Sequence, residues 1–130
     1  MKSILLVDDE QEILDIMTDL LDGFGYRVIA KLDAESALDL VRKGAAVDLV
    51  ITDLRLPGMS GTEFISALRK ILPSAPIIML TAYGSVESYI QSQSSGVFEY
   101  INKPIQAKEL RRIVKAALAL PQTDAPPNVS

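Results

Sequence analysis

Five short apolar runs recur at nearly even spacing, and this recurrence limits the fold more than any other feature of the 130-residue chain. The runs end at residues 7, 30, 52, 80 and 101, so successive ends lie 23, 22, 28 and 21 residues apart. Each interval has room for one helix and two loops. The runs, which are rich in leucine or β-branched residues and therefore favour strands, cover residues 4–7, 26–30, 47–52, 77–80 and 98–101.

Segments with helical periodicity lie between these runs. The second helix is expected to begin at an N-cap, Asp33, and the third to stop before Pro73. Segment 86–95 is dominated by serine and glutamine, so we expect its helix to be the least stable element. The first helix carries an apolar stripe of Ile13, Ile16 or Met17, Leu20 and Phe24.

Apolar strands that alternate with helices are typical of a parallel sheet covered on both faces. Right-handed crossovers leave few topologies for five such units. We therefore predict an α/β fold over residues 1–120: a doubly wound, flavodoxin-like (βα)5 sheet of five parallel strands in the order 2-1-3-4-5. Residues 121–130 hold adjacent prolines and no periodicity, which predicts a flexible tail or the start of an interdomain linker.

The composition excludes several kinds of chemistry. The chain has no cysteine and no histidine, which rules out disulfides, thiolate sites, histidine-based triads and histidine-ligated metals. A net charge of −4 argues against nucleic-acid binding by this segment. No apolar run is long enough to span a membrane, and the run before Asp8 has only four residues, too few for a signal peptide. We expect a cytoplasmic protein whose chemistry uses carboxylates, hydroxyls, lysines or a bound ion.

Acidic residues follow two of the predicted strands. Asp8 and Asp9 come after the first strand and Asp53 after the third, and in open sheets ligands bind beyond the strand ends where the strand order reverses. Two carboxylates about 5 Å apart repel by roughly 3 kcal/mol at an effective dielectric constant of 20, so the cluster favours a cation. Oxygen ligands favour Mg²⁺. The alternative for each acid alone is that it caps the following helix.

Two further residues are expected at the same edge. Thr81 follows the fourth strand and Lys103 the fifth. A hydroxyl, a lysine and a metal ion around one carboxylate are the groups that phosphoryl transfer needs. A cis Lys103–Pro104 bond, which proline allows at low cost, would aim the lysine inward. Taken alone, Thr81 is better explained as a helix cap and Lys103 as a solvated surface lysine.

These residues stand in four motifs that, together and in this order, resemble the receiver domains of two-component response regulators. The resemblance covers residues 2–120. Segment 81–87 also resembles receivers of NtrC-type transcriptional regulators, with hybrid histidine kinases and single-domain regulators as the alternative parent proteins. The motifs are Val7-Asp8-Asp9-Glu10, Asp53-Leu54-Arg55-Leu56-Pro57-Gly58-Met59-Ser60-Gly61, Thr81-Ala82 and Tyr100-Ile101-Asn102-Lys103-Pro104.

The resemblance implies a phosphorylation-activated signalling switch rather than an enzyme in the ordinary sense. Asp53 would accept a phosphoryl group from a phosphohistidine on a sensor histidine kinase or a phosphotransfer protein. Asp9 and Asp53 would ligate Mg²⁺ directly, Asp8 through water, and Arg55 through its backbone carbonyl.

The same resemblance assigns the readout of the switch. Lys103 and Thr81 would bind phosphoryl oxygens, and Tyr100 would turn inward as Thr81 is drawn to the phosphoryl group. For Tyr100 the equally good alternative is an ordinary half-buried strand residue. The face formed by the fourth helix, fifth strand and fifth helix would then move. Homodimerisation through that face is left open, because the fourth helix departs from the usual pattern at Tyr89, Ser92 and Ser95. Ile13, Leu14 and Ile105 are candidates for a kinase-docking patch, although for Ile13 core packing is the favoured alternative.

Other functions fit less well. A phosphatase of the haloacid dehalogenase type needs Asp-x-Asp after the first strand, whereas the acids here are adjacent and the candidate nucleophile follows the third strand. A nucleotide- or flavin-binding domain needs a glycine- or serine-rich loop where these acids stand. The remaining alternative is a receiver-like interaction module that acts without phosphorylation.

Overall fold

Helices and strands alternate along residues 1–53, 55–81 and 97–119, which are the residues that the structure, a computed structural model, describes. The elements are β1 (Ser3–Val7), α1 (Gln11–Gly23), β2 (Arg27–Lys31), α2 (Ala34–Arg42), β3 (Leu49–Asp53), β4 (Arg55–Leu56), β5 (Met59–Ser60), α3 (Gly61–Ile71), β6 (Ile77–Thr81), β7 (Glu99–Asn102) and α5 (Ala107–Leu118). The helix predicted within 86–95 and the tail predicted at 121–130 lie outside the described residues.

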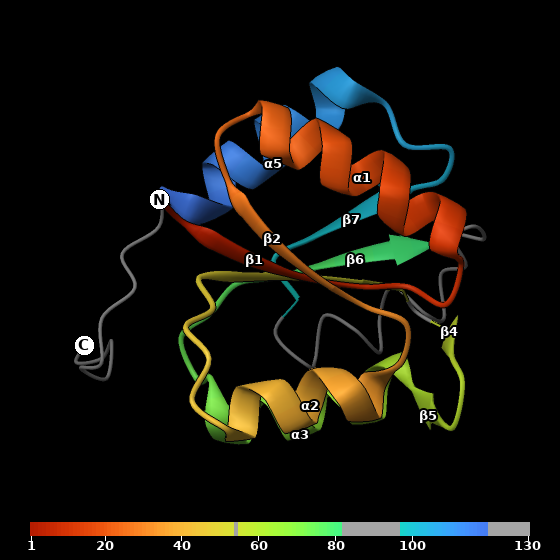
Figure 1. Cartoon of the computed structure of the whole chain (residues 1–130), viewed down its shortest axis with the longest axis vertical. Helices are drawn as coiled ribbons and strands as arrows, with labels where there is room; N and C mark the ends of the chain where they lie inside the picture. The colour runs from red at the N-terminus through yellow and green to blue at the C-terminus, as the bar shows by residue number, and fades with distance from the viewer. Residues whose placement is uncertain (54, 82–96, 120–130) are drawn as a thin grey trace.

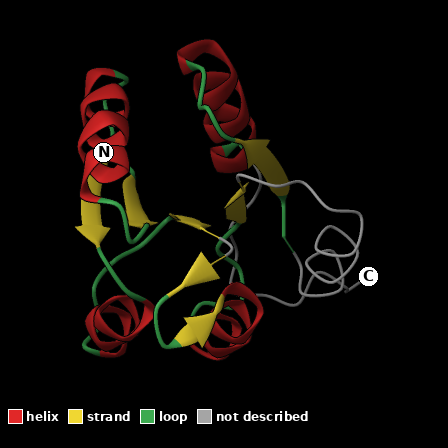
Figure 2. Ribbon diagram, turned by 90° about the vertical axis from the view of Figure 1, so that its right-hand side faces the viewer, coloured by secondary structure: helices red, strands yellow, loops and turns green. Residues whose placement is uncertain are grey.

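The main sheet has five strands in the order β2-β1-β3-β6-β7, and every neighbouring pair is parallel. Because β6 and β7 are the fourth and fifth of the predicted strands, this confirms the predicted order 2-1-3-4-5. Helices α1 and α5 cover one face of the sheet, and α2 and α3 cover the other (Figures 1 and 2). The strand order reverses between β1 and β3, where the sequence places its acids.

Four strands, β2, β3, β6 and β7, end one residue later than their apolar runs. Asp53 pairs with Leu80, and Thr81 pairs with Asn102, so Asp53 and Thr81 are the last residues of β3 and β6 rather than the first residues of loops. Their backbones still make ladder bonds, which do not depend on an apolar side chain. The sequence therefore placed the strand ends correctly to within one residue.

A short antiparallel hairpin, β4–β5, was not predicted. Each of its strands has two residues, too few to show any periodicity. The turn between them contains Gly58, whose φ of 75° lies in the left-handed region that glycine adopts readily. The hairpin carries the chain from the end of β3 to the start of α3.

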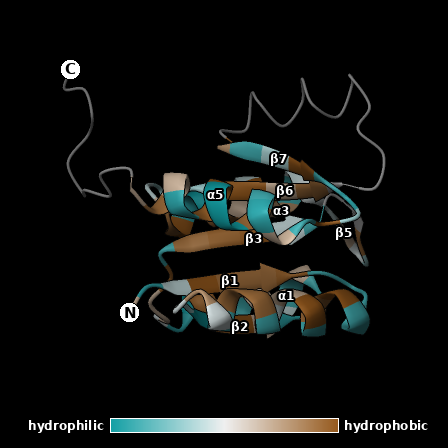
Figure 3. Ribbon diagram, turned by 90° about the horizontal axis from the view of Figure 1, so that it is seen from above, coloured by the Kyte–Doolittle hydropathy of each residue, from teal (hydrophilic) through white to brown (hydrophobic). Residues whose placement is uncertain are grey.

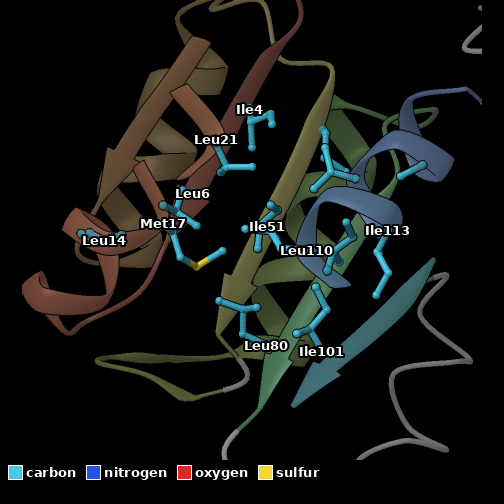
Figure 4. Close-up of a cluster of buried hydrophobic side chains, with 14 residues drawn as sticks. Ile4, Leu6, Leu14, Met17, Leu21, Ile51, Leu80, Ile101, Leu110 and Ile113 are labelled. Atoms are coloured by element: carbon cyan, nitrogen blue, oxygen red, sulfur yellow. The ribbon is translucent and has the colours of Figure 1, made fainter. Parts of the chain in front are cut away.

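Alternation along the strands divides the core into two clusters, one on each face of the sheet. Ile4 and Leu6 of β1 point into the cluster beneath α1 and α5, and Leu5 and Val7 point into the cluster beneath α2 and α3. Figure 4 shows the first cluster. Its residues come from both helices and from the four strands β1, β3, β6 and β7: Ile4, Leu6, Leu14, Met17, Leu21, Leu49, Ile51, Ile78, Leu80, Ile101, Leu110, Ile113, Val114 and Ala117.

The buried stripe of α1 differs from the predicted one. Leu14, Met17 and Leu21 are the buried residues, whereas Ile16 is 51% exposed. Leu14 was predicted to belong to a kinase-docking patch, but it is 2% exposed and belongs to the core, so that prediction is wrong. An apolar residue near the site has the same sequence pattern whether it faces the sheet or the solvent.

Local signals for two helix starts are present as side-chain hydrogen bonds. The Ser36 backbone N–H donates to Asp33 Oδ1 at 2.7 Å, which confirms Asp33 as the N-cap of α2. Ser60 and Glu63 form a reciprocal capping box at the start of α3. That helix ends at Ile71, before Pro73, as predicted.

None of the helices in the described ranges is long and apolar enough to cross a membrane. The cytoplasmic location stays a prediction.

Candidate functional site

Three charged side chains meet at the edge of the sheet where the strands end. Lys103 Nζ lies 3.0 Å from Asp8 Oδ2 and 3.1 Å from Asp53 Oδ2. The side chains are 13%, 0% and 12% exposed, respectively. Two acids that the sequence placed at this edge therefore share one ammonium group in a nearly solvent-free place.

The topology explains why these residues meet. β1 and β3 are neighbours, so Asp8, directly after β1, lies beside Asp53 at the end of β3. Lys103 directly follows β7, which is separated from β3 by β6, a distance of two strand spacings of about 4.8 Å each. The four-carbon stem of the lysine spans that gap to reach Asp53. The Lys103–Pro104 bond is cis, as predicted.

Thr81 and Arg55 occupy the expected backbone positions. Thr81 ends β6, the strand between Asp53 and Lys103, and Arg55 lies two residues after Asp53 in β4. The side chains of both fall outside the described part of the structure. Their predicted roles therefore stay predictions.

Glu10 belongs to the same cluster and was missed. Glu10 Oε1 lies 3.5 Å from Lys103 Nζ, although the Glu10 side chain is 62% exposed. Carboxylate oxygens of Asp8, Asp9 and Glu10 all lie within 4.8 Å of one another. The available signal was a third consecutive acid after a strand, which the sequence analysis quoted as part of a motif without giving it a role.

The interpretation of Asp8 and Asp9 as helix caps does not fit the start of α1. The N-cap of α1 is Glu10, and no side chain caps this helix end. Asp8 Oδ1 instead accepts a hydrogen bond of 2.9 Å from the Glu10 backbone N–H, which holds the loop before the helix. Its other oxygen, Oδ2, stays turned toward the sheet edge and Lys103.

Burial dominates the pKa shift of Asp8, whereas neighbouring charges dominate the pKa shift of Lys103. Desolvation raises the pKa of Asp8, and this outweighs the Glu10 N–H and the Lys103 ammonium, which favour the ionised carboxylate. For Lys103, desolvation alone would lower the pKa, but the ion pairs with Asp8 and Asp53 outweigh it and the pKa is raised. Lys103 is therefore protonated at neutral pH, whereas ionisation of the buried Asp8 costs free energy.

The residues present fit a divalent cation. Asp8 Oδ2 is buried and accepts no hydrogen bond from any residue described, even with the ammonium 3.0 Å away. Carboxylate oxygens of Asp8, Glu10 and Asp53 lie within 3.5 Å of the Lys103 ammonium group. Asp9 adds a carboxylate within 4.8 Å of those of Asp8 and Glu10, so all the donor atoms are oxygens. Hard cations such as Mg²⁺ prefer such donors.

Tyr100 and the remaining predicted docking residues lie near this edge. Tyr100 is half-buried on β7 and packs against the cluster beneath α2 and α3. Ile13 and Ile105 are half-buried against the other cluster. All three keep partly exposed surface, so the structure is compatible with the switch role predicted for Tyr100 and the docking role predicted for the two isoleucines, without testing either.

Sequence comparisons identify related proteins. A family model for the response regulator receiver domain matches residues 4–115. The transcriptional regulatory protein ZraR of Klebsiella oxytoca is 36% identical over 116 residues, which cover 89% of this chain and 26% of ZraR. GlrR of Escherichia coli (strain K12), also named a transcriptional regulatory protein, is 33% identical over 93% of this chain and 28% of GlrR. The chain thus spans about a quarter of the length of these curated relatives, whose names agree with the predicted resemblance to NtrC-type regulators.

Solved structures show the same fold. A CheY-like response regulator receiver domain protein from Methanospirillum hungatei JF-1 superposes with a TM-score of 0.86 at 34% identity, covering 91% of this chain and 94% of that one. NtrX from Brucella abortus superposes with a TM-score of 0.84 at 30% identity, covering 91% of this chain and 27% of NtrX.

Proposed function

The chain belongs to the response regulator receiver domain family of two-component systems, whose members change state when they are phosphorylated. From this premise we propose that Asp53 is its phosphoryl acceptor. The donor is a phosphohistidine on a sensor histidine kinase or a phosphotransfer protein. In the transfer, a phosphorus–oxygen bond to the Asp53 carboxylate forms while the phosphorus–nitrogen bond breaks, and the departing imidazole keeps the electron pair.

The observation that carries this proposal is the position of Lys103 between Asp53 and Asp8. Phosphorylation adds a charge of about −1.5 to −2 to a nearly buried carboxylate. An ammonium group that already lies 3.1 Å from Asp53 Oδ2 can offset the charge on the phosphoryl oxygens without a large movement. Its raised pKa keeps Lys103 charged at neutral pH.

Receiver domains generally depend on Mg²⁺, and we propose that the acids here hold it. Asp9 and Asp53 are the direct ligands, Asp8 acts through water, and Arg55 contributes its backbone carbonyl. The hydrogen-bond-free Asp8 Oδ2 and the cluster of carboxylates support this assignment. When bound, the ion supplies positive charge that offsets both the acids and the phosphoryl oxygens.

The proposed readout uses residues of the neighbouring strands. Thr81 at the end of β6 donates its hydroxyl to the phosphoryl group, and Tyr100 on β7 turns inward. Hydrogen bonds to charged groups contribute about 1.5–3 kcal/mol each, and about 5.5 kcal/mol moves a two-state equilibrium from 1:99 to 99:1. Two or three such bonds are enough to move the face that β7, α5 and the predicted fourth helix form. The names of the relatives support transcription as the controlled output.

Intact-mass measurement tests the proposal. The chain is incubated with acetyl phosphate and Mg²⁺, and we expect a gain of one phosphoryl group that EDTA prevents. Asp53→Asn should show no gain. Asp48→Asn is the matched control, because Asp48 lies just before the other end of β3 and accepts a hydrogen bond from the Ser3 N–H that asparagine can also accept. Labelling of Asp53→Asn at the parent rate, or labelling that ignores Mg²⁺, would overturn the proposal and favour an interaction module that works without phosphorylation.

A further inference from the structure

Helix α1 presents a stripe of four acids to solvent. Glu12, Asp15, Asp19 and Asp22 are all exposed and recur at intervals of three or four residues, so they share one face of the helix. The buried residues of α1 are Leu14, Met17 and Leu21, which places the acids on the side facing away from the sheet. α1 contains no lysine or arginine. None of the four acids forms an ion pair within the described residues.

Helix α5 presents the opposite charge in the same way. Lys108, Arg111, Arg112 and Lys115 are exposed, and the buried residues of α5 lie on the other side of the helix. None of these cations has a carboxylate partner in the part of the chain that the structure covers. The Arg111 guanidinium lies 5.5 Å from the ring centroid of Phe24, which follows α1 directly. The two helices are therefore neighbours on one face of the sheet, as Figure 3 shows from above.

The two stripes match position by position. Glu12, Asp15 and Asp19 are the second, fifth and ninth residues of α1, and Lys108, Arg111 and Lys115 hold the same positions in α5. Both helices follow parallel strands and run back across the sheet, so they point in the same direction (Figure 1). Acids and cations therefore lie at similar heights along the two helices.

Stability of the separate helices does not explain the stripes. Acids four residues apart on a helix repel one another, and Asp19 and Asp22 stand near the negative end of the α1 dipole. Lys108 stands in the first turn of α5, near the positive end of that dipole. Glu12 and Lys115 favour their own helix dipoles, whereas Asp19, Asp22 and Lys108 oppose them. Helix-dipole interactions therefore do not account for the stripes as a whole.

A second copy of this chain supplies a partner of opposite charge for each stripe. Consider a two-fold axis that lies between α1 and α5 and runs parallel to them. It places α1 of each copy over α5 of the other copy, and every residue keeps its position along the helix direction. A two-fold axis across the helices would instead set each acidic stripe against its own copy. Only the first arrangement pairs acids with cations twice.

We propose that the α1–α5 face, defined by these eight charged residues, is a homodimer interface with its two-fold axis along the helices. Ile16 adds an apolar contact. It is 51% exposed and lies three residues after Ile13 and four before Leu20, two residues that pack against the core shared with α5. Helices about 20 Å long give a footprint of roughly 400 Å² per copy, at the low end of interface sizes. This predicts a weak dimer with a dissociation constant on the order of 0.1 mM.

Sedimentation velocity on the chain with paired charge reversals tests this interface. One variant carries Glu12→Lys, Asp15→Lys and Asp19→Lys; the other carries Lys108→Glu, Arg112→Glu and Lys115→Glu. We expect each variant alone to be monomeric and an equimolar mixture to dimerise, because both contacts are complementary again in the mixed pair. In each variant one reversal improves the helix-dipole interaction (Asp19, Lys108) and another weakens it (Glu12, Lys115). The two effects offset each other, so both variants should fold, which far-ultraviolet circular dichroism checks.

The control variant carries Arg42→Glu and Lys70→Glu, on helices of the opposite face. It should dimerise like the parent chain, and raising the NaCl concentration from about 0.05 to 0.5 M should weaken the parent dimer about tenfold, since exposed charges are screened. A parent chain that stays monomeric at about 1 mM in low salt would overturn the proposal. So would a dimer that survives either reversal, or a mixture of the two variants that stays monomeric.

Discussion

Asp8 is completely buried, and burial raises its pKa above the ordinary value of 3.8. The folded chain therefore binds this proton more tightly than the unfolded chain does. The group favours folding most at acidic pH, and that contribution is lost as pH rises through its folded pKa. At neutral pH the ionised Asp8 thus costs stability, which is expected of a carboxylate kept for binding a cation.

Replacing this carboxylate should therefore stabilise the fold. We predict that Asp8→Asn raises the free energy of unfolding in urea at pH 7, without Mg²⁺, by on the order of 1 kcal/mol. Asparagine Oδ1 can still accept the Glu10 N–H hydrogen bond. The gain should shrink as pH falls toward 4. A variant less stable than the parent chain at pH 7 would contradict the pKa direction.

Lys103 should show the opposite behaviour. Lys103→Met leaves Asp8 and Asp53 without their shared ammonium group and should lower the free energy of unfolding by about 2 kcal/mol. In the Asp8→Asn background the same change should cost about half as much, because one of the two buried charges is gone. Equal costs in both backgrounds would show that the Asp8–Lys103 contact carries no coupling energy.

The sequence predicted the residues of this site better than their environments. Asp8, Asp53 and Lys103 follow from the ends of predicted strands, because topology alone brings those ends to one edge. The proximity of Glu10 to Lys103 depends on the path of the loop before α1, which no periodicity describes. Only one oxygen of Asp8, Oδ1, accepts a hydrogen bond, and this difference between its two oxygens likewise depends on three-dimensional packing.

At the scale of elements, the start of α2 offers a test of local coding. Asp33→Ala removes the acceptor for the Ser36 N–H and should lower the free energy of unfolding by about 1 kcal/mol at pH 7, whereas Asp33→Asn should cost less, since asparagine also caps helices. Hydrogen bonds from Ser36 lower the pKa of Asp33 below 3.8. Its stabilising contribution is therefore present above that value and lost as pH falls through the folded pKa.

Urea titrations of the three chains at pH 7 and near pH 3 measure this contribution. The gap between the parent chain and Asp33→Asn should narrow at the lower pH. A gap that widens there would contradict the lowered pKa.

Element positions were predictable where periodicity is long and not where it is short. In helices α2, α3 and α5 the buried residues recur at helical spacing and so lie on one face of each helix. In α1 both Ile16 and Met17 fit an apolar stripe with helical spacing, so the stripe alone did not decide between them. Packing buries Met17. The two-residue strands β4 and β5 depend on the turn at Gly58 rather than on any pattern of side chains.

At the scale of the whole molecule, a bound cation should stabilise the fold. If the acids bind Mg²⁺ only in the folded chain, a concentration ten times the Kd adds about 1.4 kcal/mol to the free energy of unfolding and raises Tm. Differential scanning calorimetry with increasing MgCl2 should show this rise. Asp8→Asn should show a smaller rise, and an equal ionic strength of NaCl should show none. A Tm that does not respond to Mg²⁺ would exclude a metal site.

The central claim, that Asp53 carries the phosphoryl group, is tested most directly by locating the modification. Borohydride reduces an aspartyl phosphate to homoserine, which tandem mass spectrometry of peptides assigns to one position. After incubation with acetyl phosphate and Mg²⁺, we predict homoserine at position 53 and at no other acid of the cluster. Homoserine at position 8 or 9, 5-hydroxynorvaline at position 10, or no reduced residue in a chain that has gained phosphate would contradict the account.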